Sequence, residues 1–129
     1  MAFNILVVDD SGTVRDFFAK TLRLAQVPVG TLFQARNGAE ALSILGDHWV
    51  DLMFTDINMP VMDGLELVRR MKGDELLDRI PVVVVSAEQD QQGIEELMNL
   101  GARAYVRKPF TPERIREIVE EQLGVSDAR

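Results

Sequence analysis

Five short apolar runs alternate along the chain with longer stretches of helical periodicity, and this alternation restricts the fold more than any other feature of the sequence. The runs are Ile5–Val8, Thr31–Phe33 with its flanks, Val50–Thr55, Val82–Ser86 and Ala104–Val106. Three of them are almost continuously apolar, as is typical of strands covered on both faces in a parallel sheet. We therefore predict five strands, and we expect Trp49 and Phe54 to lie in or near the core.

The stretches between the runs carry apolar residues at the three- and four-residue spacing of helices. Asn37, Asp63 and Thr111 precede three of these stretches and are residue types that cap the first turn of a helix. Gly101 and Gly124 follow two of them, at the position where helices commonly end on glycine. Strict alternation of strand and helix implies a doubly wound α/β fold, in which a five-stranded parallel sheet has helices on both faces.

The length and composition exclude several classes of protein. With 129 residues the chain suffices for one domain, which we place at residues 1–124, with residues 125–129 as a frayed tail. There is no cysteine and one histidine, which excludes disulfides and the usual zinc sites. No apolar run approaches the ~20 residues of a membrane span, and the N-terminus lacks the basic region of a signal peptide, so we expect a cytoplasmic protein. The net charge of −7 argues against nucleic acid as a partner.

Chemically reactive residues stand at the ends of four of the predicted strands. Asp9 and Asp10 follow the first run, and Asp56 follows the third. Ser86 ends the fourth run, and Lys108 comes soon after the fifth. Ligands of open α/β sheets bind at the carboxyl ends of the strands. If the first, third, fourth and fifth strands are neighbours, these five residues meet at one edge of the sheet.

Three carboxylates at one edge require positive charge nearby. Two carboxylates about 5 Å apart repel by roughly 3 kcal/mol at an effective dielectric constant near 20. Lys108 supplies one charge, and Mg²⁺ suits a site of carboxylates and waters that also receives phosphate oxygens. One carboxylate can then attack phosphorus and form an acyl phosphate, with a hydroxyl and an ammonium as partners of the phosphoryl oxygens. Each residue alone also fits a plainer role as a cap or a solvated side chain, so this prediction depends on their combination.

Five segments carry a resemblance to a known family. They are ILVVDDS at 5–11, ARNGAEAL at 35–42, DINMPVMDGLEL at 56–67, PVVVVSAE at 81–88 and GARAYVRKPF at 101–110. Together they resemble the receiver domain of response regulators in two-component signalling, in particular its CheY-like single-domain form. The resemblance covers almost the whole chain. It implies the flavodoxin-like strand order 2-1-3-4-5 in a three-layer α/β/α sandwich.

The resemblance also implies the roles of the residues at the sheet edge. Asp56 corresponds to the phosphoacceptor. Mg²⁺ would be bound by the side chains of Asp10 and Asp56 and by the backbone carbonyl of Asn58, with Asp9 helping directly or through a water. Lys108 would bind a phosphoryl oxygen and is followed by a proline in the cis form. No other cofactor is implied.

Further residues would control the state of the switch. Ser86, which stands where threonine is common, would bind the phosphoryl group and pull its loop inward. Tyr105 occupies the position of the switching aromatic residue. Asn58, Ala87 and Glu88 would tune hydrolysis of the phosphoryl group. The surface read by a partner would include Gln92, Glu96, Arg103, Tyr105, Arg107 and Glu113.

The partners implied are proteins. A sensor histidine kinase or a phosphotransfer protein would donate the phosphoryl group, with a phosphatase as a further candidate partner. The output would be a downstream protein, such as a component of a flagellar motor or of a chemotaxis system. We expect a monomer that catalyses its own phosphotransfer and dephosphorylation, rather than a conventional enzyme.

Three alternatives remain open at this stage. A phosphohydrolase of the haloacid dehalogenase type would need aspartate in place of Ser11 in the motif that begins at Asp9. A flavodoxin-type protein would bind its cofactor phosphate at the first loop, where Asp9 and Asp10 would repel it. A receiver-like module that docks without taking a phosphoryl group is the third.

Overall fold

The computed structural model describes residues 2–87 and 89–124. Over these residues five strands alternate with five α-helices, and one 3-10 helix precedes the fourth strand. The elements are β1 (Phe3–Val8), α1 (Gly12–Leu24), β2 (Val29–Ala35), α2 (Gly38–Asp47), β3 (Leu52–Thr55), α3 (Gly64–Lys72), η1 (Leu77–Arg79), β4 (Val82–Ser86), α4 (Gln91–Leu100), β5 (Ala104–Arg107) and α5 (Pro112–Leu123). Glu88 and the predicted frayed tail lie outside the described residues.

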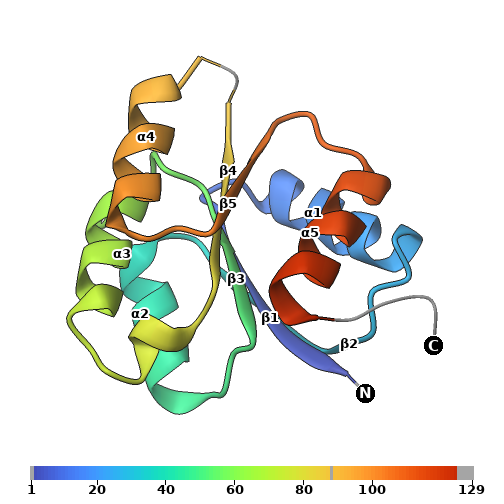
Figure 1. The fold of residues 1–129 in the computed structure, drawn as a ribbon, viewed down its shortest axis with the longest axis horizontal. Coiled ribbons are helices and arrows are strands. Elements are labelled where there is room, and N and C mark those ends of the chain that lie inside the picture. Colours follow the sequence, from blue (N-terminus) through green and yellow to red (C-terminus); the bar gives the residue numbers. More distant parts are fainter. Residues whose placement is uncertain (1, 88, 125–129) are drawn as a thin grey trace.

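The five strands form one sheet in the order β2-β1-β3-β4-β5, and every neighbouring pair is parallel. The predicted α/β class and strand order are therefore confirmed. Helices α2, α3 and α4 cover one face of the sheet, and α1 and α5 cover the other (Figure 1). Among the described residues, no helix is both long enough and apolar enough to cross a membrane.

The sheet is buried on both faces, which explains the continuous apolar runs. In β4, Val82 and Val84 belong to the core cluster beneath α2, α3 and α4, whereas Val83 and Val85 belong to the cluster beneath α1 and α5. All four valines are at most 4% exposed. Phe54 of β3 is completely buried, as expected.

Helix ends follow the predicted signals. The side chains of Asn37, Asp63 and Thr111 accept hydrogen bonds from backbone N–H groups in the first turns of α2, α3 and α5. Gly101 ends α4 and Gly124 ends α5, both in the left-handed conformation that glycine adopts without strain.

The prediction that Trp49 lies in or near the core is wrong. Strand β3 begins at Leu52 rather than at Val50, so Trp49 falls in the connection from α2. Its ring is 68% exposed. The indole Nε1 donates a hydrogen bond to the carboxylate of Asp51 at 2.8 Å, so the polar end of the ring is paired at the surface.

Candidate functional site

The carboxyl ends of the central strands meet at one edge of the sheet. The backbone N–H of Asp56, directly after β3, donates to the carbonyl of Val8 at the end of β1 (2.9 Å). The backbone N–H of Lys108, directly after β5, donates to the carbonyl of Ser86 at the end of β4 (2.8 Å). The parallel order β1-β3-β4-β5 thus brings together the reactive residues predicted from the sequence.

Three carboxylates form a cluster at this edge. Asp9, Asp10 and Asp56 each offer a carboxylate oxygen, and these oxygens all lie within 4.8 Å of one another. Asp9 is 3% exposed, Asp56 is half-buried and Asp10 is exposed. Asp9 is held in place through its Oδ1, which accepts a hydrogen bond from the backbone N–H of Ser11 at 2.9 Å.

Lys108 connects two of these carboxylates. Its Nζ lies 3.0 Å from Oδ2 of Asp9 and 3.4 Å from Oδ2 of Asp56. The other oxygen of Asp56, Oδ1, accepts a hydrogen bond from the backbone N–H of Ile57 at 2.7 Å. The ammonium therefore neutralises part of the charge of the cluster, and both oxygens of Asp56 are oriented.

The pKa values of Asp56 and Lys108 reflect this arrangement. Burial raises the pKa of Asp56 above its ordinary value, and the Asp9 carboxylate adds to the rise, while Lys108 and the Ile57 N–H oppose it. Burial alone would lower the pKa of Lys108, but the hydrogen bond to Asp9 and the charges of Asp56 and Asp9 outweigh it, so this pKa is raised. Lys108 therefore stays protonated at neutral pH.

The donor set suits a hard divalent cation. The three clustered ligands are all carboxylate oxygens, which Mg²⁺ and similar cations prefer to nitrogen or sulfur donors. Among the described residues, no hydrogen-bond donor contacts the carboxylate of Asp10, so its oxygens are available. In Asp9 both oxygens already accept hydrogen bonds, from Ser11 and Lys108. Both oxygens of Asp56 likewise accept hydrogen bonds, from Ile57 and Lys108, so Asp10 is the carboxylate best placed to ligate a metal directly.

Ser86 closes the neighbouring strand and is 1% exposed. Its Oγ donates a hydrogen bond to the backbone carbonyl of Ala87 at 3.1 Å. The hydroxyl is therefore engaged with its own loop rather than with Asp56. Ala87 is exposed and presents only a methyl group at the rim of the site.

The loop after Asp56 contains a contact that the sequence analysis missed. Asn58 is exposed, and its Nδ2 donates to Oδ2 of Asp90 at 2.8 Å. Asp90 is the N-cap residue of α4. An aspartate just before a helical stretch is a recognisable cap signal, but its partner lies 32 residues away, and local patterns do not show such a contact.

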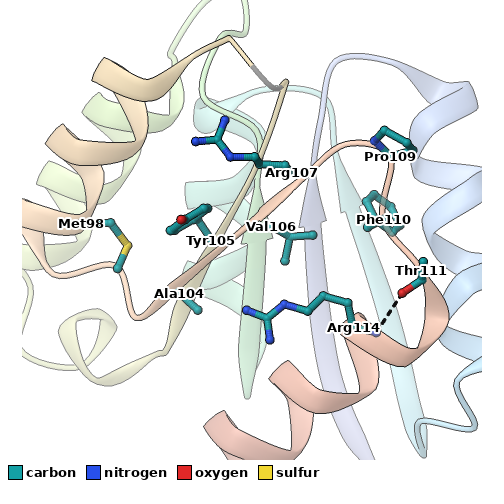
Figure 2. Close-up of a pocket in the computed structure, with 9 residues that line it drawn as sticks. All are labelled: Met98, Ala104, Tyr105, Val106, Arg107, Pro109, Phe110, Thr111 and Arg114. Atoms are coloured by element: carbon teal, nitrogen blue, oxygen red, sulfur yellow. Dashed lines mark hydrogen bonds between the residues drawn. The ribbon is translucent and has the colours of Figure 1, made fainter.

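The predicted readout residues lie on α4, β5 and α5, except for Arg103, which directly precedes β5. A groove of about 510 Å³ opens between α4 and α5. Its lining consists of Met98, Ala104, Tyr105, Val106, Arg107, Pro109, Phe110, Thr111 and Arg114. Figure 2 shows the Tyr105 ring on the side of β5 that faces Met98 of α4. Tyr105 is 40% exposed, and the guanidinium of Arg107 lies 5.6 Å from the centroid of its ring.

The fold and the site together define a class of protein. A parallel sheet in the order 2-1-3-4-5, with an acidic cluster and a lysine at its carboxyl edge, has the architecture of CheY-like signalling domains. Comparison with known proteins agrees with this class. The chain matches the response regulator receiver domain over residues 5–120, and it belongs to this family.

Individual relatives support the assignment. The chain is 37% identical over 117 residues to the chemotaxis protein CheY of Pseudomonas aeruginosa, covering 91% of this chain and 93% of that protein. A putative response regulator from Chloroflexus aurantiacus has a similar structure, with a TM-score of 0.87, 27% identity and coverage of 97% and 100%. The phosphorylated cyanobacterial phytochrome response regulator RcpA is also similar, with a TM-score of 0.83, 26% identity and coverage of 98% and 97%.

The chain is therefore a CheY-like receiver domain of two-component signalling. Membership of this family implies interaction with a kinase and with downstream targets.

Proposed function

We propose that residues 1–124 form a receiver domain that accepts a phosphoryl group on Asp56 from a sensor histidine kinase or a phosphotransfer protein. The observation that carries this proposal is the position of Lys108, whose ammonium bridges Asp9 and Asp56 beside a third carboxylate. Asp56 is a half-buried aspartate with a raised pKa at an open sheet edge, and groups with perturbed pKa values cluster at functional sites. The similarity to a phosphorylated response regulator supports the same function.

Phosphorylation would form a bond between an Asp56 oxygen and phosphorus as the bond from phosphorus to the donor nitrogen breaks. The nucleophile must be ionised, and Lys108 and the Ile57 N–H favour the ionised form of Asp56, because both oppose the rise in pKa that burial causes. Lys108 would then share its ammonium between Asp9 and a phosphoryl oxygen. Mg²⁺, held by Asp10 and Asp56 and by the backbone carbonyl of Asn58, would neutralise charge on the transferring group.

The new charge would move Ser86. Its hydroxyl now donates to the carbonyl of Ala87, and a phosphoryl oxygen is a stronger acceptor because it is charged. As Ser86 and its loop turn toward Asp56, space opens behind them. Tyr105 pairs with Val84 of the neighbouring strand and is the large side chain placed to fill that space. The groove in Figure 2 would change shape as Tyr105 moves inward.

The partner would be a protein that distinguishes these two shapes, such as a flagellar motor or chemotaxis component. Of the predicted readout residues, Gln92 and Glu96 lie on α4, Arg107 lies on β5 beside Tyr105, Glu113 lies on α5, and Arg103 directly precedes β5. A phosphatase that approaches the same sheet edge would end the signal. The exposed Ala87 leaves that edge open, so we propose a short-lived phosphoryl group, tuned at positions 58, 87 and 88.

Labelling with acetyl phosphate and Mg²⁺, followed by intact mass, tests the proposal. We expect an adduct of about 80 Da that is absent in Asp56→Asn. Rapid turnover of many phosphomonoesters would instead favour a phosphohydrolase. A parent protein that takes no adduct but still binds its partner would favour a docking module that is not phosphorylated.

A further inference from the structure

The carboxylate of Asp90 joins the phosphoacceptor loop to the first turn of α4. Its Oδ2 accepts a hydrogen bond from Nδ2 of Asn58 at 2.8 Å. Its Oδ1 accepts a hydrogen bond from the backbone N–H of Gly93 at 3.3 Å, which caps α4. One side chain therefore both begins a helix and holds the residue two positions after Asp56.

This contact keeps the Asn58 amide occupied. A charge-assisted hydrogen bond holds an exposed side chain in one rotamer more firmly than a neutral one does. Among the described residues, the carboxylate of Asp56 receives hydrogen bonds from Ile57 and Lys108 and none from Asn58. The Asn58 amide is therefore hydrogen-bonded to the N-cap residue of α4 and not to Asp56, although Asn58 and Asp56 lie in the same loop.

We propose that Asp90 is a positioning residue that prolongs the lifetime of the phosphoryl group on Asp56 by holding the Asn58 amide against α4. The inference rests on the proposed function, because it concerns removal of that group. In hydrolysis the oxygen of a water bonds to phosphorus while the bond from phosphorus to the Asp56 oxygen breaks. The products are inorganic phosphate and the Asp56 carboxylate, and the water gives up a proton to phosphate or solvent.

An amide side chain can promote this reaction by orienting the water. It accepts a hydrogen bond through its oxygen and donates one through its nitrogen, so it can hold a water in line with the breaking bond. Asn58 can do so only while it is away from Asp90. Loss of the Asn58–Asp90 hydrogen bond therefore increases the fraction of time in which Asn58 assists hydrolysis.

Two substitutions at Asp90 separate this role from helix capping. Serine also caps helices, but its single short hydroxyl cannot serve Gly93 and reach Asn58 together, so Asp90→Ser keeps the cap and loses the contact. Asp90→Asn keeps both, because its oxygen can cap Gly93 while its NH₂ group donates to Oδ1 of Asn58 after that amide turns over.

The test compares the decay of the phosphoryl group in these variants. Each protein is labelled with acetyl phosphate and Mg²⁺, the donor is removed, and loss of the adduct is followed by intact mass. We expect Asp90→Ser to decay about three- to ten-fold faster than the parent, which is the effect of one net hydrogen bond. Asp90→Asn is expected to decay at a rate between those of the parent and Asp90→Ser, because its neutral hydrogen bond holds Asn58 less firmly than the carboxylate does. In an Asn58→Ala background Asp90→Ser is expected to change nothing.

Several outcomes would overturn the inference. The first is a decay in Asp90→Ser that is as slow as in the parent, or slower. The second is that Asp90→Ser accelerates decay equally with and without Asn58→Ala, which would assign the effect to the cap of α4. Asn58→Ala alone leaves the cap intact and must decay no faster than the parent, so it serves as the test if Asp90→Ser melts early. A parent that takes no adduct contradicts the proposed function, and the inference then fails with it.

Discussion

Lys108 and Asp9 form an ion pair of 3.0 Å across 99 residues of sequence, and the same ammonium lies 3.4 Å from Asp56. Asp9 is almost fully buried, so the lysine is fixed at the site by a partner that solvent hardly reaches. One ammonium nevertheless faces three carboxylates. The metal-free site therefore keeps an excess of negative charge, and this excess determines how the protein should respond to cations and to pH.

Mg²⁺ is expected to stabilise the protein, and Asp10→Asn to reduce that effect. A ligand that binds only the folded state adds about 1.4 kcal/mol of stability at ten times its Kd. Asp10→Asn removes a ligand and a repelling charge, so the metal-free variant should melt above the metal-free parent. Thermal melting with and without millimolar Mg²⁺ checks both effects.

Asp47→Asn is a suitable control for this experiment. Asp47 is an exposed carboxylate at the end of α2, outside the acidic cluster, and its loss should leave the Mg²⁺ response unchanged. A parent whose melting is indifferent to millimolar Mg²⁺ would contradict the metal site.

Asp56→Asn is expected to stabilise the metal-free protein at neutral pH but not at acid pH. Burial raises the pKa of Asp56, so its ionised form is less favourable in the folded state than in the unfolded state. This cost is absent below the ordinary pKa, grows as pH rises toward the raised pKa and is constant above it. Denaturant unfolding in chelator across pH 3–8 measures the difference between the variant and the parent.

Glu66→Gln provides a control of opposite sign. Its hydrogen bond and charge interaction with Arg70 lower the pKa of Glu66, so the pair contributes stability above the ordinary pKa that is lost as pH falls through the lowered value. Glu66→Gln should therefore be slightly less stable than the parent at neutral pH. A gain from Asp56→Asn that persists at acid pH would contradict the assigned cause.

Most of the fold could be predicted from the sequence because each strand is buried on both faces. Val82–Val85 face two different clusters in turn, and no polar residue interrupts them. Trp49 could not be placed in this way. Hydrophobic character alone does not show where β3 begins. The indole N–H of Trp49 also donates a hydrogen bond to Asp51 at the surface, and the sequence pattern does not show this contact.

The site was predictable only in part. Asp9, Asp10, Asp56 and Lys108 follow strands directly, and strand order alone brings them together. The contact between Asn58 and Asp90 depends on the side-chain conformations of two loops, and no periodicity records it.

Gly64→Ala is expected to destabilise the protein and to disturb the site. A Cβ at this buried first residue of α3 would overlap the backbone oxygen of Asp56, so the loop between them must shift. Overpacking of this kind costs about 1–3 kcal/mol.

Gly46→Ala in α2 is the control, because a Cβ there meets nothing within 4 Å and should stabilise the helix by about 0.5 kcal/mol. Denaturant unfolding and acetyl phosphate labelling test both variants, and a fully stable, normally labelled Gly64→Ala would contradict the close packing of this loop.

Ser86→Ala is expected to accept the phosphoryl group on Asp56 but to transmit it poorly. Ser86 is 1% exposed and its hydroxyl donates to the carbonyl of Ala87. Removal of the hydroxyl should therefore leave the carboxylate cluster unchanged and delete only the group that would turn toward the phosphoryl oxygen. Labelling by intact mass should therefore match the parent, while partner affinity should no longer respond to phosphorylation.

Tyr105→Trp is expected to report the proposed change in shape of the groove between α4 and α5. The ring of Tyr105 is 40% exposed beside Arg107, and inward movement would bury it, so indole emission should shift to shorter wavelength when beryllium fluoride and Mg²⁺ mimic the phosphoryl group. The background signal can be removed with Trp49→Phe, because Trp49 is 68% exposed and contributes little to the core.

Asp56→Asn in the same Trp49→Phe, Tyr105→Trp background is the control and should abolish the shift in emission. If phosphorylation favours one of two packings, as we propose, the shift and the change in partner affinity must titrate together. Emission that ignores the mimic while partner binding still responds would show that Tyr105 is not the relay.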